Sequence, residues 1–364
     1  MQPRRSRGIF GVPDLVGADD VLQGKDIADR IRSSVAFSNR CMSTTQPLVT
    51  IVINNYNYAR FLSKAIDSAL NQSYPAIEIV VVDDGSTDNS SELIGRYAGR
   101  LCHIATQNGG QASALSEGIA NSHGEMICFL DSDDYFLDNK IEELVRVFQR
   151  LYKETSSFLL YHLLEIVNER GEALGDRIPR HIYNVPENLY EYACKYRFLP
   201  YVASPTSGLA LSRTLANRIF PLPSEARVCA DDFVVRAAAL LGRIFGIDKV
   251  LGAYRVHGEN RWFGNKPLKS VEFMRVMESF LNQKLRENDL APVVSFFNSS
   301  YSRPYSRNRW ADIRLAVSVV KHHCDSSTVR FALRTLADCI KRDYPASELA
   351  TSNVNSHDAD SSVS

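Results

Sequence analysis

Between residues 48 and 131 the chain alternates short apolar runs with amphipathic segments, and this alternation constrains the fold more than any other feature. Residues 59–72 and 111–120 carry the apolar spacing of helices. Three apolar runs of strand length predict buried strands: 48–53 (LVTIVI), 77–82 (IEIVVV) and 125–130 (EMICFL). Such alternation is typical of a parallel sheet with helices on both faces, so we predict an α/β fold.

Composition excludes several other classes of protein. Lys and Arg (42) balance Asp and Glu (42), so no overall positive charge attracts nucleic acid, and we expect no nucleic-acid partner. The seven cysteines are scattered without a CxxC pair, which argues against a disulfide framework or a zinc site and favours a reducing compartment. No apolar run approaches the roughly 20 residues of a membrane span. We therefore expect a cytoplasmic protein, with at most peripheral contact on the inner face of a membrane.

The chain of 364 residues is long enough for one large domain with extensions. We predict four regions: an N-terminal extension at 1–46 that is only partly ordered, a main domain at 47–262, a helical C-terminal region at 263–345 and a disordered tail at 346–364. The tail is rich in Ser, Asp, Asn and Ala, a composition that cannot bury a core.

Two acidic clusters follow predicted strands. Asp83 and Asp84 come after 77–82, and Asp131-Ser132-Asp133-Asp134 comes after 125–130. Because open α/β sheets bind ligands beyond the carboxyl ends of their strands, we expect the clusters to meet at one site. Asp131 and Asp133 could both turn toward a hard divalent cation, Mg²⁺ or Mn²⁺. The alternative is an acidic turn that caps the helix expected at 138–150.

Other residues near these strand ends could contact a nucleotide. Asp83 or Asp84 could accept a hydrogen bond from a base or a ribose, or could belong to a simple turn. Tyr56, after the first strand, could stack on a base or merely cover the core. Gly110 precedes a helix and would let the backbone approach a ligand closely.

Two later segments carry further candidates. Asp231 and Asp232 open a helix at 231–242, where acids favour the helix dipole but could also supply a catalytic base. Arg255 and His257 lie on the same face of an extended segment and could meet a diphosphate or a metal ion. A lone histidine is more often structural, so that alternative stays open.

Taken in order, five segments resemble the family 2 inverting glycosyltransferases: VTIVINNYNYARFLSKAIDSALNQSYPAIEIVVVDDGSTDNS, NGGQASALSEGIANSHGEMICFLDSDD, SPTSGLALSR, ADDFVVRAAALLG and YRVHGEN. The resemblance implies the GT-A fold, with a nucleotide-sugar half at 47–153 and an acceptor half at 154–262. It also implies metal-dependent transfer of a sugar from a nucleotide-diphosphate sugar to an acceptor hydroxyl, with inversion. The cofactor would be Mn²⁺ or Mg²⁺, and the acceptor a glycan or lipid-linked glycan in surface polysaccharide or glycoconjugate synthesis.

The resemblance also assigns roles to residues. It places the nucleoside at Asn54 and Tyr56, the base at Asp84 beside Asp83, the metal motif at Asp131 and Asp133, the acceptor side at Thr206, Ser207 and Gly208, and the catalytic base at Asp232 with Asp231 beside it. Asn54 stands where many members have Pro. Leu115 and Ser116 stand where Arg-Asn is frequent, so Arg255 and His257 become candidates for the missing cation.

Two alternatives remain. A nucleotidyltransferase also pairs Mg²⁺ with acids on an α/β sheet, but it would usually carry a Gly-rich basic loop near its N-terminus. A non-catalytic protein of the same fold could bind sugar nucleotides or glycans. In the C-terminal region, basic helices are interrupted by acids such as Glu272 and Glu278. That pattern favours packing over a membrane role, and we expect only weak, salt-sensitive membrane contact.

Overall fold

The structure is a computed structural model that describes most of the chain between residues 46 and 296 and one later helix. Of the 364 residues, it describes 46–183, 185, 189–197, 199, 203–258, 260, 271–296, 313, 316, 317, 320 and 326–341. The expected N-terminal extension, of which only Gln46 is described, and the expected tail at 346–364 lie outside these residues.

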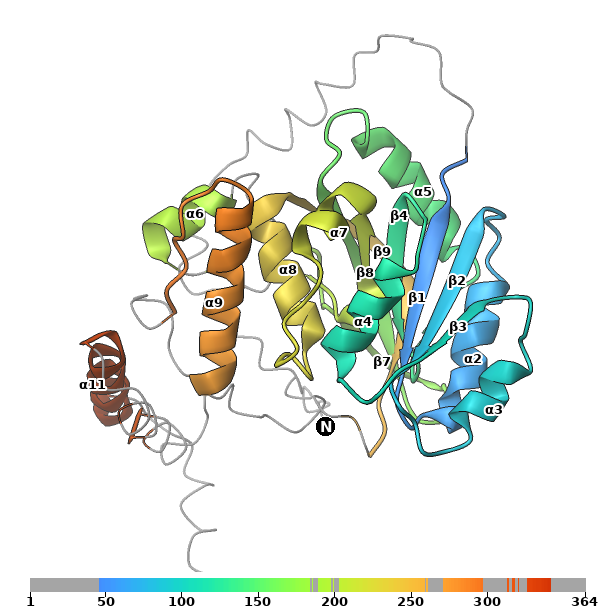
Figure 1. Ribbon diagram of the computed structural model, residues 1–364, viewed down its shortest axis with the longest axis horizontal. Helices are drawn as coiled ribbons and strands as arrows, with labels where there is room; N and C mark the ends of the chain where they lie inside the picture. The colour runs from blue at the N-terminus through green and yellow to red at the C-terminus, as the bar shows by residue number, and fades with distance from the viewer. Residues whose placement is uncertain are drawn as a thin grey trace, which may run out of the picture. The chain divides into compact units, whose positions relative to one another are not determined.

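One nine-stranded sheet runs through the described chain (Figure 1). The strands are β1 (Val49–Asn55), β2 (Ile77–Asp83), β3 (Cys102–Ala105), β4 (Met126–Asp131), β5 (Tyr135–Phe136), β6 (Phe158–Val167), β7 (Ala173–Ile178), β8 (Leu209–Ser212) and β9 (Arg243–Arg255). Their order is β3-β2-β1-β4-β8-β6-β9-β5, with β7 paired to β6. The first four strands are parallel, whereas β8 is antiparallel to both neighbours. This confirms the predicted α/β fold.

Three helices connect the first four, parallel strands: α2 (Ala59–Leu70), α3 (Ser90–Gly95) and α4 (Gln111–Ala120). Helices α2 and α4 lie where the apolar spacing predicted them. The other described helices are α5 (Lys140–Leu151), α6 (Leu189–Tyr196), the short 3-10 helix η1 (Thr206–Gly208), α7 (Arg213–Ile219), α8 (Ala230–Leu241), α9 (Val271–Glu287) and α11 (Ser326–Lys341). Within the described residues, no helix has both the length and the apolar character that a bilayer span requires.

The sheet is covered on both faces, because alternate residues of each strand point to opposite sides. Val52 of β1 and Phe129 of β4 pack in one apolar cluster with α4, α8 and α9. Their neighbours Ile51 and Cys128 pack in the other cluster, with α2 and α5. Helices α2 and α4 therefore lie on opposite faces of the sheet.

The register of the parallel strands brings their polar ends together. Asn55 of β1 pairs with Asp83 of β2, and Asn54 pairs with Asp131 of β4. The two acidic clusters thus flank the end of β1, as the sequence predicted. The same sheet continues past residue 154, so the division into a nucleotide half and an acceptor half stays a prediction.

Helix α4 approaches β1 so closely at one position that any side chain larger than glycine forces its neighbours to move. A Cβ atom added to Gly118 would lie 2.3 Å from Cγ1 of Val52, a buried side chain. We expect Gly118→Ala to lower the free energy of unfolding by about 1–3 kcal/mol, because the core must shift to admit the methyl group. Gly95→Ala is the matched control, since no heavy atom lies within 4 Å of a Cβ there. Equal denaturation midpoints for the two variants would contradict this packing.

Candidate active site

Three carboxylates gather at the end of β4. One carboxylate oxygen from each of Asp131, Asp133 and Asp134 lies within 4.8 Å of the other two. Hard divalent cations prefer such oxygen ligands, and a cation would relieve the mutual repulsion of the three charges. The donor set therefore fits the Mg²⁺ or Mn²⁺ expected from the sequence.

Asp134 is the structural member of this cluster. It is buried, and its carboxylate accepts hydrogen bonds from Ser207 Oγ (2.6 Å) and from the backbone N–H of Arg255 (2.8 Å). Burial, followed by the charges of Asp133 and Asp131, raises its pKa well above the ordinary value. Asp134 thus connects the end of β4 to η1 and β9. The helix that follows, α5, begins after Asn139 and has no side-chain hydrogen bond capping its N-terminus.

Asp133 is more accessible and is positioned from β9. His257 Nε2 lies 3.0 Å from Asp133 Oδ2, and the histidine side chain is fully buried while the aspartate side chain is 16% exposed. The imidazole packs against the rings of Tyr58 and Phe61, at centroid distances of 5.3 and 5.0 Å. These contacts fix the ring, so it can orient the Asp133 carboxylate.

Arg255 contacts the backbone rather than an acidic side chain. Its Nε donates to the carbonyl of Asp133, and its Nη1 donates to the carbonyl of Glu169, both at 2.7 Å. The sequence made Arg255 a candidate for binding the nucleotide sugar. In the structure Arg255 contacts the backbone carbonyl of Asp133, and its role in binding the nucleotide sugar stays a prediction.

Asp131 lies at the centre of a hydrogen-bond network. Its Oδ1 accepts a hydrogen bond from Gln111 Nε2 (2.9 Å), and its backbone N–H donates to Ser207 Oγ (3.0 Å). Burial and the charges of Asp133 and Asp231 raise its pKa from 3.8 to about 7, against the hydrogen bonds from Asn54 and Gln111.

Gln111, the first residue of α4, joins three parts of the site. Besides Asp131, its Nε2 donates to Thr206 Oγ1 (3.1 Å), and its Oε1 accepts from the backbone N–H of Ala230 (3.0 Å). Because a backbone N–H can only donate, it fixes the orientation of the amide. One side chain thus links the acidic cluster to η1 and to the start of α8. This role of Gln111 was not predicted from the sequence, where its only signal is its place after the NGG turn.

Asp83 and Asp84 are both buried and contact the chain itself. Asp83 Oδ1 accepts from Asn55 Nδ2 (3.1 Å), and Asp84 accepts from the backbone N–H groups of Gly109 (2.8 Å) and Gly110 (2.7 Å). Charge-assisted bonds of this kind hold a carboxylate in one orientation. The two acids therefore hold the loops that follow β1 and β3, and contact with a nucleobase remains a prediction for both.

A neighbouring segment and a backbone conformation with positive φ both require glycine at position 110. Its φ is +87°, and a Cβ atom would lie 2.6 Å from the Cα of Arg227. The following N–H, of Gln111, donates to the carbonyl of Arg227 at 3.0 Å. The close approach that the sequence suggested is thus made to the 227 segment within the chain.

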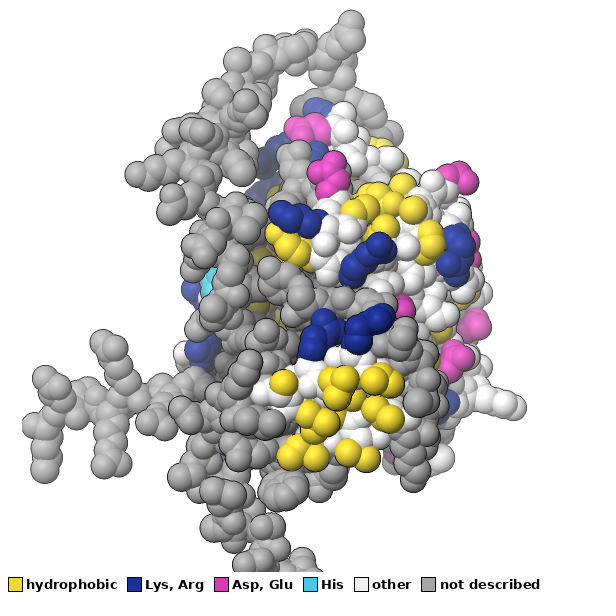
Figure 2. Space-filling view, turned by 90° about the vertical axis from the view of Figure 1, so that its left-hand side faces the viewer, with side chains coloured by type: hydrophobic (Ala, Val, Ile, Leu, Met, Phe, Trp, Pro, Cys, Tyr) yellow, Lys and Arg dark blue, Asp and Glu magenta, His cyan; other side chains and the backbone are white. Residues whose placement is uncertain are grey.

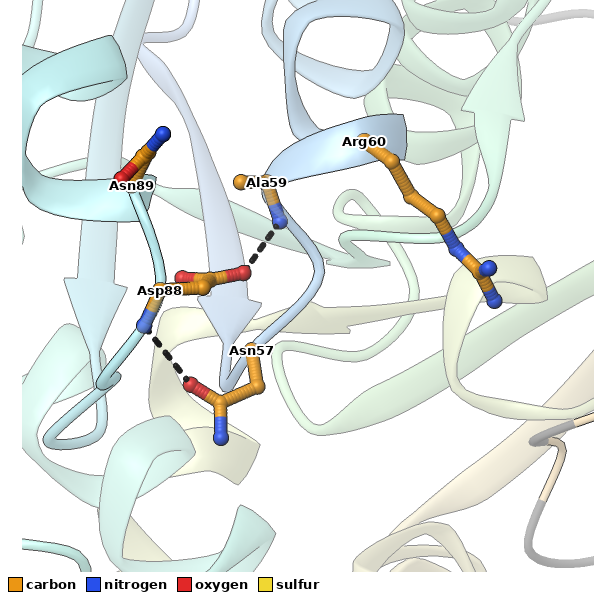
Figure 3. Close-up of a pocket in the computed structure, with 5 residues that line it drawn as sticks. All are labelled: Asn57, Ala59, Arg60, Asp88 and Asn89. Carbon is orange, nitrogen blue, oxygen red and sulfur yellow. Dashed lines mark hydrogen bonds between the residues drawn. The ribbon is translucent and has the colours of Figure 1, made fainter.

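The loops that follow β1 and β2 are locked together (Figure 3). Asn57 Oδ1 accepts from the backbone N–H of Thr87 (2.7 Å), and Asp88 Oδ2 accepts from the N–H of Ala59 (2.9 Å). Closer to the sheet, the Oδ1 of Asn54 is buried without a hydrogen-bond partner among the described residues. Tyr56 in the same loop is half-buried.

The two acids at the start of α8 have different surroundings. Asp232 is 3% exposed, and its Oδ1 accepts from Arg236 Nε at 2.6 Å, one turn along the same helix. Asp231 is half-buried, and its charge raises the pKa of Asp131. Of the two acids, Asp231 is therefore the one whose charge affects the pKa of a carboxylate in the cluster.

The predicted acceptor-side residues reach the same site through their hydrogen bonds. Thr206 contacts Gln111, and Ser207 contacts both Asp131 and Asp134. Gly208 is buried where a Cβ atom would lie 2.3 Å from the Cβ of Ser204, so its role is in packing.

Comparisons with known proteins identify the family of the chain. The sequence model of glycosyl transferase family 2 matches residues 50–172. An uncharacterised glycosyltransferase from Nostoc sp. is 32% identical over 290 residues, covering 73% of this chain and 85% of that protein. A chondroitin synthase from Pasteurella multocida is 27% identical over 76% of this chain, but over only 27% of the synthase. A Pyrobaculum calidifontis mannosyltransferase, solved with GDP-Man and Mn²⁺, aligns with 87% of this chain and 82% of its own at 18% identity and a TM-score of 0.43.

The family match and the Nostoc relative together place the chain. It belongs to glycosyl transferase family 2 and is a glycosyltransferase.

Asp131 should make the metal-free protein less stable as the pH rises. Its folded-state pKa of about 7 lies above the ordinary 3.8, so between these values the folded chain binds more protons than the unfolded chain. This contribution is complete below the ordinary pKa and is lost as the pH rises through the folded-state pKa. We therefore expect Asp131→Asn, in EDTA, to gain stability relative to the parent as the pH is raised across that window.

Chemical denaturation at several pH values measures this difference. Asp138→Asn, at an exposed carboxylate in the same loop, is the control variant. A stability difference between Asp131→Asn and the parent that stays constant with pH would contradict the assignment of a protonated Asp131.

Proposed function

We propose that the chain transfers a sugar from a nucleotide-diphosphate sugar to an acceptor hydroxyl by metal-dependent direct displacement, with inversion at the anomeric carbon. The observation that carries this proposal is the cluster of Asp131, Asp133 and Asp134 at the end of β4 in a family 2 chain, where the charge of Asp231 also raises the pKa of Asp131. One base and one metal motif, without a placed nucleophile, suit a single displacement.

Asp133 and Asp131 are the proposed ligands of Mn²⁺ or Mg²⁺. A bound divalent ion would stabilise the negative charge of the departing diphosphate. His257 orients Asp133 in the metal-free chain and stays our candidate for a further ligand. Gln111 and Ser207 hold Asp131 in place, so the metal site would be largely preformed.

Asp231 is the proposed general base, in place of the Asp232 that the sequence suggested. An ion pair with Arg236 stabilises the charged form of Asp232 and orients it into the protein. Asp231 is more exposed and interacts electrostatically with Asp131. It can accept the acceptor's proton as the sugar is attacked, which is typically worth about 10²–10⁴-fold in rate.

In this proposal, the remaining predicted residues line the binding sites of the nucleotide-sugar donor and of the acceptor. The nucleoside lies beyond Asn54, Tyr56, Asp83 and Asp84, and the acceptor approaches η1 and Asp231. The match to a chondroitin synthase supports a polysaccharide or glycoconjugate acceptor. Family membership argues against the nucleotidyltransferase alternative, and a non-catalytic binding protein is an outcome of the tests below.

Donor turnover should depend on a divalent metal ion. We expect slow release of the nucleoside diphosphate from one member of a nucleotide-sugar panel with Mn²⁺ or Mg²⁺, and none in EDTA. Asp133→Ala should lose this activity because it removes a proposed ligand, whereas Asp138→Asn should keep it. Turnover by Asp133→Ala in EDTA would contradict metal dependence, and donor binding without any turnover would support the non-catalytic alternative.

The two acids of α8 should have separable effects. We expect Asp231→Asn to lower kcat by about 10²–10⁴-fold with little change in the donor's KM, as removal of a general base does. Asp232→Asn should instead lower the melting temperature, because it weakens a buried ion pair, and should retain more activity. If Asp232→Asn folds but is inactive while Asp231→Asn is active, the general base is Asp232 and the proposed assignment is wrong.

Weak, salt-sensitive contact with an anionic membrane completes the proposal, together with a cytoplasmic location. Figure 2 shows hydrophobic side chains gathered beside Lys and Arg on one face. In the C-terminal region Val317, Val320 and Leu333 are 57%, 37% and 62% exposed, and Arg330 and Arg334 are exposed as well. Apolar area and basic charge together favour anionic lipid surfaces. Co-sedimentation with anionic liposomes at low and high salt tests this, and a protein that fails to pellet at low salt would contradict it.

A further inference from the structure

A cavity of about 460 Å³ is lined by Arg255, whose guanidinium contacts the loop that carries Asp133. Its walls come from the start of α2, from β5, from the turn between β6 and β7, and from the end of β9. Arg255 connects it to the active site, because the guanidinium lines the cavity and donates to the Asp133 carbonyl. The Asp133 carboxylate, by contrast, interacts with His257.

The cavity concentrates positive charge in a chain whose formal net charge is zero. Its charged lining is Arg60, Lys64, Arg170, Arg255 and Glu169, four cations against one acid. Arg60 extends away from Asp88 and Asn57 (Figure 3), and its Nη1 lies 3.3 Å from Glu169 Oε1. Among the described residues, Lys64, Arg170 and Arg255 form no ion pair.

Arg255 is the most telling of these cations. It is only 5% exposed, and buried charged side chains are normally paired. Its hydrogen bonds to the carbonyls of Asp133 and Glu169 fix the plane of the guanidinium, which also lies 4.8 Å from the ring centroid of Phe61. A fixed guanidinium without a carboxylate partner is preorganised for an oxyanion.

The rest of the lining leaves room for the body of a ligand. Tyr135 and Phe61 supply aromatic surface, and Lys64 Nζ lies 5.1 Å from the ring centroid of Tyr135. Gly171 has no side chain to fill the space: a Cβ atom there would lie 3.7 Å from Arg255 Nη1. A sugar ring that carries an anionic group matches such a mixture of aromatic and cationic walls.

We propose that this cavity binds an oxyanion, a phosphate or a carboxylate, carried by the acceptor. Helix α2 lies on the face of the sheet opposite α4, whereas Gln111 and Gly110 border the proposed donor site from α4. Apart from Arg255, no residue of the cavity lining belongs to the set proposed for the donor and its metal. Assignment of the anion to the acceptor rests on the proposed transferase function, but binding of the anion itself does not.

Ligand-observed NMR on the full chain in EDTA tests the proposal. Without metal, the carboxylates of the donor site repel anions, so bound anion reports on the cavity. The probes are inorganic phosphate, followed by the width of its phosphorus signal, and glucuronate, followed by saturation transfer. We expect at least one to bind, and the double variant Lys64→Glu with Arg170→Glu to bind at least tenfold more weakly. Arg150→Glu, at an exposed residue of α5 outside the cavity, should bind like the parent.

The outcomes separate the two sources of the oxyanion and the two proposals. Binding of phosphate alone supports a phosphate-bearing acceptor, and binding of glucuronate alone supports an acidic sugar. No binding of either probe, or equal affinities in the parent and the double variant, would overturn the cavity's role. Both substituted side chains are exposed, so the variant should fold and should still bind nucleoside diphosphate with Mn²⁺. If the parent chain itself fails to bind nucleoside diphosphate with Mn²⁺, the result counts against the proposed function and not against the cavity's role.

Discussion

The mutual repulsion of three carboxylates at the end of β4 is the constraint on which the site depends. One carboxylate oxygen from each of Asp131, Asp133 and Asp134 lies within 4.8 Å of the other two, and Asp134 is almost fully buried. Like charges this close cannot all remain ionised without compensation. The chain supplies that compensation as hydrogen-bond donors, one set for each carboxylate, and each set comes from a different part of the fold.

These donors explain why distant segments converge here. Gln111 from α4 reaches Asp131, Ser207 from η1 reaches Asp134, and His257 from the end of β9 reaches Asp133. Beneath them, Lys140 donates to the carbonyl of Ser207 at 2.8 Å, and burial lowers the pKa of its ammonium group to about 7. The site therefore depends on segments from several parts of the fold being in place. A ligand that adds positive charge would stabilise the three carboxylates.

The sequence predicted the architecture because apolar periodicity reports burial directly. The strands before Asp83 and Asp131 were visible as apolar runs, and parallel strands must end at the same edge of a sheet. Side-chain direction was harder to predict. Nothing in ADDF indicates that Asp232 would be buried against Arg236 while the charge of Asp231 acts on Asp131, since that depends on how α8 packs. The role of Gln111 was likewise invisible, because its partners lie 20, 95 and 119 residues away along the chain.

The central claim is that the carboxylates at the end of β4 hold the metal that binds the donor's diphosphate. The most direct measurement is anomalous scattering at the manganese edge from crystals grown with Mn²⁺ and the nucleoside diphosphate released in the donor panel. The account predicts one manganese peak within bonding distance, about 2.1–2.3 Å, of an Asp133 oxygen and of a diphosphate oxygen. A nucleotide bound at the ends of β1 and β2 with its manganese ligated elsewhere, or with no manganese, would contradict it.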